Sequence, residues 1–194
     1  MESPSAAITT MEQRYKYALS LLVEQKYIIA IKEFESIINT APDSEYAEVS
    51  QINIGRTYFL NGDYKRALKA YEKVLEKYPG TKKTEEILER EYQLGIAQMD
   101  TNEEAAIKVF EKIIEKHHLG PVAPDAQVKI ADCYFKLGQY EEALDAYEKF
   151  LENYPKSEWV PYIQYQIPLS KVYHEKQQER NYGLLIAARG GCEE

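Results

Sequence analysis

The sequence contains little cysteine, glycine and tryptophan. Its 194 residues include 2 Cys, 9 Gly and 1 Trp. Cys133 and Cys192 lack metal-ligand spacing, which excludes a cysteine-rich zinc site or a scaffold of several disulfides. The sequence favours the interpretation that both cysteines are lone thiols, and a single disulfide between them is the alternative. Folds of many short strands need glycines in their turns. The small number of glycines therefore indicates an all-α chain.

Long apolar runs are also missing. The stretches Tyr27–Ile31 and Leu184–Ala188 fall far short of the ~18–20 apolar residues that a membrane span needs. The amino end shows no basic region followed by an apolar core, so no signal peptide is expected in the sequence as it stands. No cysteine lies near the amino end to carry a lipid, so a lipid anchor is possible only outside this chain.

Basic charge is in deficit. The chain has 24 Lys and Arg against 32 Asp and Glu, a formal net charge of -8. A surplus of carboxylates repels the phosphate backbone, which disfavours a nucleic-acid-binding protein. One residue type is abundant instead, since the sequence has 17 Tyr. Large amphipathic rings in a glycine-poor chain are typical of packed helices.

Internal repetition organises the chain. The segment Gly62–Lys73 matches Gly138–Lys149 nearly position for position, and weaker copies begin at Gln25 and Asn102. In each copy an alanine is followed four residues later by an aromatic ring. These pairs are Ala30 and Phe34, Ala67 and Tyr71, Ala106 and Phe110, and Ala143 and Tyr147. Each copy therefore predicts two amphipathic helices, A and B, whose small residues allow close packing.

Helix A carries small residues at the equivalent places Ala18, Gly55, Gly95 and Ala131, and helix B ends at Pro42, Pro79 and Pro155, with His118 in the third copy. This pattern resembles the tetratricopeptide repeat (TPR). The resemblance implies an all-α, right-handed α-solenoid of about five tetratricopeptide-like helix pairs, the last incomplete or irregular. We expect a flexible amino-terminal segment (1–11) and a single repeat domain (12–194). Its units are about 12–44, 45–82, 84–119, 121–156 and 158–194.

The fifth unit departs from the pattern. Pro168 occupies the place of the small residue on helix A. Because proline removes a backbone hydrogen bond, we expect a kink or break near 164–168. The distance to Ala188, the next alanine that fits, predicts an insertion in the turn around 175–181.

No motif indicates catalysis. His117 and His118 are adjacent, so their side chains point ~100° apart on a helix and chelate one metal poorly. Ser170 and His174 are four residues apart, but no orienting carboxylate or oxyanion donor is evident. Neither a glycine-rich phosphate loop nor a His-Glu-x-x-His sequence occurs. We therefore expect no enzyme activity, no cofactor and no metal site.

Two surfaces are candidates for binding another protein. The first is a peptide groove along the A helices, expected at Tyr15, Arg56, Phe59, Tyr92, Asp132, Phe135, Tyr165 and Leu169. The alternative is that several of these side chains pack between repeats. The second is a basic stripe formed by Lys65, Lys69, Lys73 and Lys77. It is either a solvated face paired with neighbouring glutamates or a docking face for an acidic partner.

Residues 105–194 resemble a narrower family. The segments His117–Val122 and Tyr154–Tyr165 are similar to motifs of the BamD family of outer-membrane assembly lipoproteins. The resemblance implies a non-catalytic scaffold on the periplasmic face of the outer membrane. It also implies protein partners, namely the barrel-assembly protein or unfolded barrel substrates.

Two other classes of function stay open. The chain is alternatively another cell-envelope repeat protein of the Tol-Pal type, or a cytosolic adaptor that binds a peptide in its concave groove. The remaining class is an enzyme or regulatory domain that uses His117 or His174.

Overall fold

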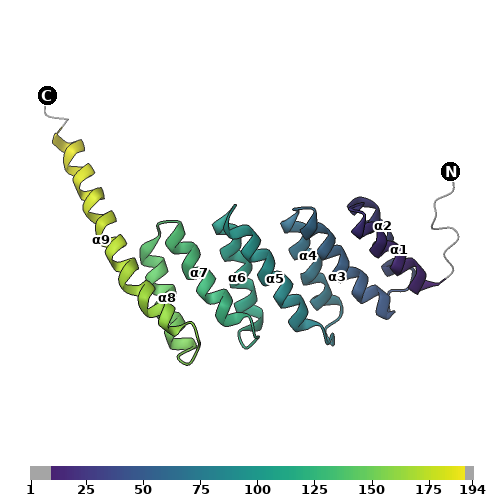
Figure 1. The fold of residues 1–194 in the computed structure, drawn as a ribbon. Coiled ribbons are helices and arrows are strands. Elements are labelled where there is room, and N and C mark those ends of the chain that lie inside the picture. Colours follow the sequence, from purple (N-terminus) through teal and green to yellow (C-terminus); the bar gives the residue numbers. More distant parts are fainter. Residues whose placement is uncertain (1–9, 191–194) are drawn as a thin grey trace. The chain divides into compact units, whose positions relative to one another are not determined.

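The computed structural model describes residues 10–190, with side chains up to residue 187, and all regular structure in that range is helical (Figure 1). The chain divides into two compact units, Met1–Leu94 and Gly95–Glu194, called unit 1 and unit 2 below. Residues 1–9 of the expected amino-terminal segment and Cys192 lie outside the described range.

Each unit is built from successive helices that pack against their neighbours in sequence. Unit 1 contains α1 (Met11–Val23), α2 (Tyr27–Thr40), α3 (Glu45–Leu60) and α4 (Tyr64–Lys77). The boundary crosses α5 (Thr84–Met99). Unit 2 continues with α6 (Glu103–His117), α7 (Ala123–Lys136), α8 (Tyr140–Asn153) and α9 (Val160–Gly190). These helix pairs confirm the predicted all-α repeat fold.

The turns between paired helices follow from local sequence. Gly62 and Gly138 have φ of 76° and 74°, a left-handed conformation that glycine adopts without a Cβ penalty. After Gly62, the Asp63 carboxylate accepts a hydrogen bond from the N–H of Arg66 at 3.1 Å and caps α4. The Asn102 side chain caps α6 in the same way. A left-handed glycine thus precedes α4 and α8, and a side-chain cap begins α4 and α6.

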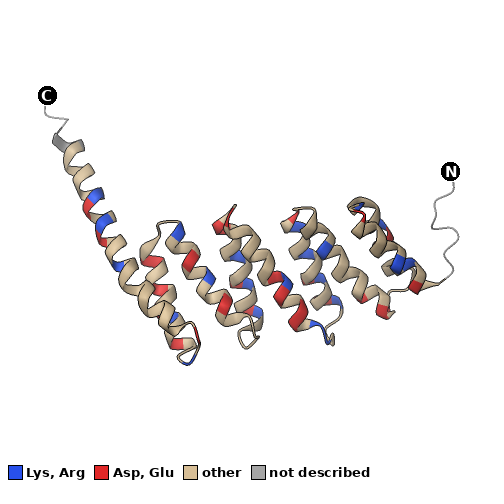
Figure 2. Cartoon of the chain, viewed as in Figure 1, with Lys and Arg blue, Asp and Glu red and all other residues tan. Residues whose placement is uncertain are grey.

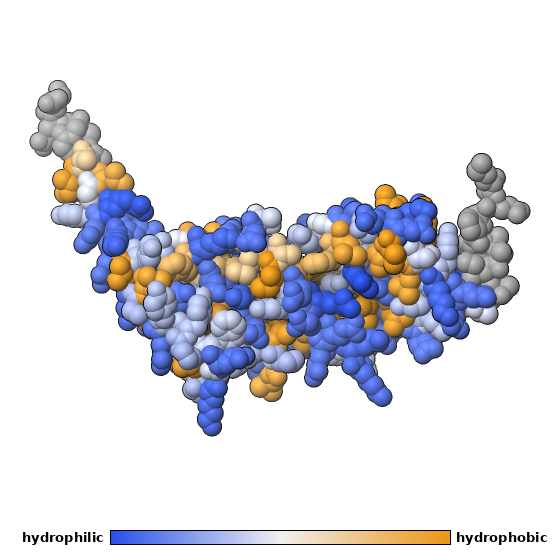
Figure 3. Space-filling model, in the orientation of Figure 1, coloured by the Kyte–Doolittle hydropathy of each residue, from blue (hydrophilic) through white to orange (hydrophobic). Residues whose placement is uncertain are grey.

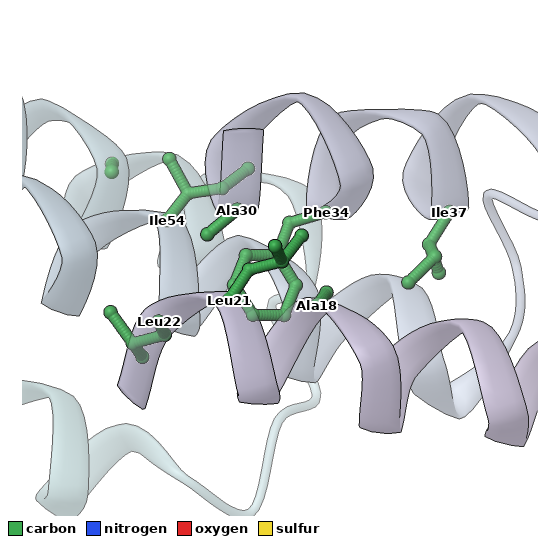
Figure 4. Close-up of a cluster of buried hydrophobic side chains, with 8 residues drawn as sticks. Ala18, Leu21, Leu22, Ala30, Phe34, Ile37 and Ile54 are labelled. Carbon is green, nitrogen blue, oxygen red and sulfur yellow. The ribbon is translucent and has the colours of Figure 1, made fainter. Parts of the chain in front are cut away.

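Small residues on the A helices make room for aromatic rings. A Cβ added to Gly55 would overlap the buried ring of Tyr71, and one added to Gly95 would lie 2.5 Å from Cε1 of Phe110. In the first repeat Ala18, Ala30 and Phe34 are fully buried, in a cluster of side chains that converge from neighbouring helices (Figure 4). The predicted close packing of small residues and rings is thereby confirmed.

The prediction of a break in the fifth unit is wrong. Helix α9 continues through Pro168 and through 175–181 as one helix of 31 residues. Gln164 and Pro168 are exposed, so water can replace the N–H donor that the Gln164 carbonyl loses. On the opposite side Ile163 and Ser170 are fully buried. A single long helix therefore stands where a fifth helix pair was expected.

The carboxyl-terminal part of α9 extends past α8 within unit 2 (Figure 1). Side chains from 178 to 187 are exposed. Among them are Tyr182, Leu184, Leu185 and Ile186, and Figure 3 shows apolar atoms at this end of the helix. No helix among the described residues is long and apolar enough to span a bilayer.

Candidate protein-binding surfaces

Unit 1 has two adjoining hollows that share Arg56 and Leu60. One, of about 440 Å³, also involves Phe59 of α3 and several polar residues of α5. The other, of about 420 Å³, is bordered by Leu19 and Val23 of α1. We call the surface formed by Leu19, Val23, Arg56, Phe59 and Leu60 the Arg56 groove.

The Arg56 groove combines apolar side chains with one available cation. Val23 is 82% exposed and Leu60 48% exposed, although both are apolar. Arg56 is exposed, whereas the neighbouring Arg90 is held by Glu86 at 2.7 Å. Such a surface suits a segment that offers an apolar side chain and a carboxylate.

Two of the predicted groove residues serve the packing between helices. The ring of Tyr15 lies 6.0 Å from that of Phe34 and 5.7 Å from that of Tyr46, and its hydroxyl oxygen accepts a hydrogen bond from the Asn53 amide at 2.8 Å. Phe135 likewise contacts the rings of Tyr140 and Tyr173, at centroid distances of 5.3 and 5.5 Å. The packing alternative therefore describes both residues.

Asp132 ties three helices of unit 2 together. Its Oδ1 accepts hydrogen bonds from the hydroxyls of Tyr147 on α8 (2.7 Å) and Tyr162 on α9 (2.8 Å). Its Oδ2 pairs with Lys129 of α7 at 3.1 Å. Lys129 also lies 5.2 Å from the ring centre of Trp159. This carboxylate is thus engaged by side chains of the protein itself.

The remaining predicted groove residues do not join the Arg56 groove. Tyr165 is 66% exposed on α9, while Leu169 and Tyr92 are half-buried. Of the eight predicted residues, Arg56 and Phe59 are the two that line one hollow together. Sequence reasoning missed Val23 and Leu60. Their signal was an apolar residue at the very end of an A helix, just before the turn.

The basic stripe lies on α4, along which Figure 2 shows blue Lys and Arg positions. Its members Lys65, Lys69, Lys73 and Lys77 are all exposed. Lys69 and Lys73 border a further hollow of about 360 Å³ between α2, α3 and α4, which we call the basic groove. The head of Lys77 lies 5.4 Å from the ring centre of Tyr78. The stripe thus forms one rim of a shallow depression.

The Ser170 hydroxyl hydrogen-bonds to its own helix, and His117 lies at a helix end. His117 is the last residue of α6, and its pKa is lowered by burial and then by Lys116. The Ser170 hydroxyl donates to the backbone carbonyl of Gln166 at 2.8 Å. Among the described residues no group of three or more His, Cys, Asp or Glu side chains could hold a metal ion.

Alkaline pH is expected to destabilise both units. Burial raises the pKa of Tyr71 and of Tyr162 to about 12, and that of the Cys133 thiol from its ordinary value of 9.0 to about 12. Above about pH 9 the folded protein holds protons that the unfolded chain releases. The stability contributed by these groups is therefore complete below about pH 9 and is lost as the pH rises toward 12. Each such group lowers the free energy of unfolding by about 1.4 kcal/mol per pH unit within its own window.

Thermal melting between pH 8 and 11.5 measures this effect. A Cys133→Ala variant should show a shallower decline from pH 9, because it lacks the first of these groups to titrate. A melting temperature that is constant up to pH 11.5 would contradict the assignment.

Comparison with known proteins identifies the repeat. The tetratricopeptide repeat family matches residues 125–157. The crystal structure of MamA protein is 20% identical, with 87% of this chain and 85% of that chain covered and a TM-score of 0.51. A tetratricopeptide repeat protein from Parabacteroides merdae is 18% identical, with 93% and 67% covered and a TM-score of 0.52. These two likenesses support the tetratricopeptide fold.

A second family match is more specific. No curated protein sequence matches the chain significantly. The family described as outer membrane lipoprotein (YfiO), which is BamD-like, matches residues 8–104. The predicted family is confirmed, although the match lies in the half of the chain opposite to the motifs at 105–194. Because it spans half of the chain, the protein belongs to the YfiO family of outer membrane lipoproteins.

Proposed function

We propose that the protein is a non-catalytic scaffold of the outer-membrane β-barrel assembly machinery, located on the periplasmic face of the outer membrane. Membership of the outer membrane lipoprotein family supports this proposal. The tetratricopeptide fold supports it too, because stacked helix pairs present extended binding surfaces. Its partners are the barrel-assembly protein or unfolded barrel substrates.

The Arg56 groove is the proposed site for a partner segment. The observation that carries this proposal is the exposed cation of Arg56 between two hollows that share the apolar side chain of Leu60, one of them also lined by Glu86 and Glu89 of α5. An extended segment would place an apolar side chain against Leu60 and Val23, and a carboxylate beside Arg56. The exposure of Val23 and Leu60 in the free protein is then explained by burial in the complex.

Site-specific photocross-linking in intact cells tests the proposal. A photoreactive residue at Leu60 should capture the barrel-assembly protein or an unfolded barrel protein, whereas one at Glu104, exposed on α6, should not. A variant with Arg56→Ala and Leu60→Ala should bind the captured partner about 10-fold more weakly, through loss of the charge contact and of apolar burial. Both side chains are exposed, so the variant should fold normally.

Three outcomes would overturn the proposal. Equal cross-linking at Leu60 and Glu104 would exclude a defined groove. Capture of other cell-envelope proteins, with no barrel component, would favour a Tol-Pal-type scaffold. Capture of cytosolic proteins alone would favour a cytosolic adaptor.

A further inference from the structure

The two units carry equivalent grooves between their B helices. In unit 1 the basic groove has a floor of Ile38, Ile54 and Tyr58. In unit 2 a hollow of about 460 Å³ between α6, α7 and α8, the acidic groove, has a floor of Ile114, Ile130 and Tyr134. Each floor residue in unit 2 lies 76 positions after its counterpart in unit 1. The two grooves therefore share one apolar framework.

Along the first part of the second B helix of each groove, the rims differ only in the charged side chains. Tyr64–Lys73 of α4 and Tyr140–Lys149 of α8 are identical except at three positions. Those positions are Lys65, Arg66 and Lys69 on α4, and Glu141, Glu142 and Asp145 on α8. All six side chains are exposed.

Each substitution reverses the sign of the charge. Three cations on α4 correspond to three carboxylates on α8, while the buried positions between them, Ala67 and Ala143, are unchanged. Helix packing within a unit does not require this reversal, because all six positions are exposed, although the Arg66 guanidinium pairs with Asp63 at 3.1 Å and lies 5.6 Å from the ring centre of Tyr58. The two faces thus have the same shape and opposite charge.

We propose that the α4 face of one copy binds the α8 face of a second copy. Each face presents a ridge helix beside a groove, so α8 can lie in the basic groove while α4 lies in the acidic groove of the partner, as helix ridges pack into grooves. The apolar floors are then covered, and the three cations meet the three carboxylates.

Charge also dictates which pairings form. Two α4 faces, or two α8 faces, would bring like charges together, so the contact joins unlike faces. Such a heterologous contact leaves one α4 face and one α8 face free, and association continues as the concentration rises. A second copy is the partner because this chain carries both members of the complementary pair.

Charge exchange between the two helices tests the proposal. The first variant carries Lys65→Glu, Arg66→Glu and Lys69→Asp, and the second carries Glu141→Lys, Glu142→Arg and Asp145→Lys. Each variant gives one helix the residues that the other already holds in the same position of its repeat. The second variant should melt like the unsubstituted chain, and the first only slightly below it, because it loses the exposed pair of Arg66 with Asp63. Sedimentation velocity at 50 mM and 500 mM salt measures the association.

The unsubstituted chain should form concentration-dependent assemblies that weaken at least ~10-fold at the higher salt, because exposed charges are screened. Each variant alone should lose self-association at least ~10-fold, since its two faces now carry like charge. An equimolar mixture should recover it, because two acidic faces then meet two basic ones. A control with Lys16→Glu, Lys32→Glu and Lys82→Glu, also exposed, should associate like the unsubstituted chain.

Absence of self-association at 50 mM salt, or failure of the mixture to recover it, would overturn the proposal. The proposal would also be overturned if the chain never self-associated and its α4 face instead bound a different, acidic protein. These results are independent of cross-linking at Leu60, which reports on the Arg56 groove.

Discussion

Ala67→Glu is expected to abolish the cooperative folding of unit 1. Ala67 is fully buried on α4, one turn before the buried ring of Tyr71. A carboxylate there would be removed from water at a fully buried position in the packing between helices. The expected loss of unfolding free energy is more than ~4 kcal/mol, a large part of the stability of a small domain.

Hydrogen exchange read helix by helix, together with thermal melting, measures this loss. Protection of the amides in α2, α3 and α4 should collapse. The matched control is Lys69→Glu, which introduces the same side chain two residues later at an exposed position and should change stability by less than about 0.5 kcal/mol. An unchanged melting curve for Ala67→Glu would contradict the packing register of the repeat.

Asp132→Ala is expected to destabilise unit 2 by about 2–4 kcal/mol. The change leaves the hydroxyls of Tyr147 and Tyr162 without their acceptor and Lys129 without its partner. When a partly buried polar group loses a charged partner, the loss of unfolding free energy exceeds the net contribution of the hydrogen bond, because the group is left without water or partner. Burial, followed by the Asp132 charge, raises the pKa of Tyr147, which therefore stays protonated as a donor.

Urea unfolding compares this variant with Tyr162→Phe, which removes one donor and should cost about 1 kcal/mol. Comparing the two losses of unfolding free energy distinguishes the contribution of the Asp132 carboxylate from that of the Tyr162 hydroxyl alone. If Asp132→Ala left stability unchanged and instead weakened partner binding, Asp132 would belong to the peptide surface as the sequence pattern predicted.

Local regularities made the repeat predictable. The turn at Gly62 and the pair of Gly55 with Tyr71 depend on residues within one helix pair, so a repeated spacing reveals them. Pro168 misled the same reasoning. Proline breaks a helix when the freed carbonyl is buried, and exposure of Gln164 is a tertiary property that one sequence does not display.

The candidate surfaces were likewise predictable only in part from the sequence. The sequence pattern placed Tyr15, Phe135 and Asp132 beside Arg56 and Phe59, since all follow the A-helix register. Which of them is covered depends on contacts with other helices, such as the hydrogen bond of Tyr162 to Asp132, 30 residues away. Such long-range contacts left Arg56 and Phe59 lining a hollow and buried the others to different degrees.

The sequence by itself determined the helical class, the first four helix pairs, the recurring turns and the opposite charges of α4 and α8. These features depend on the spacing and identity of residues that are close together in the sequence. Only the tertiary structure decided that α9 is one continuous helix, that Asp132 joins three helices, and that Arg56 and Leu60 share two hollows. The physical reason is that exposure depends on which helices pack over a side chain, and that packing joins residues far apart in the chain.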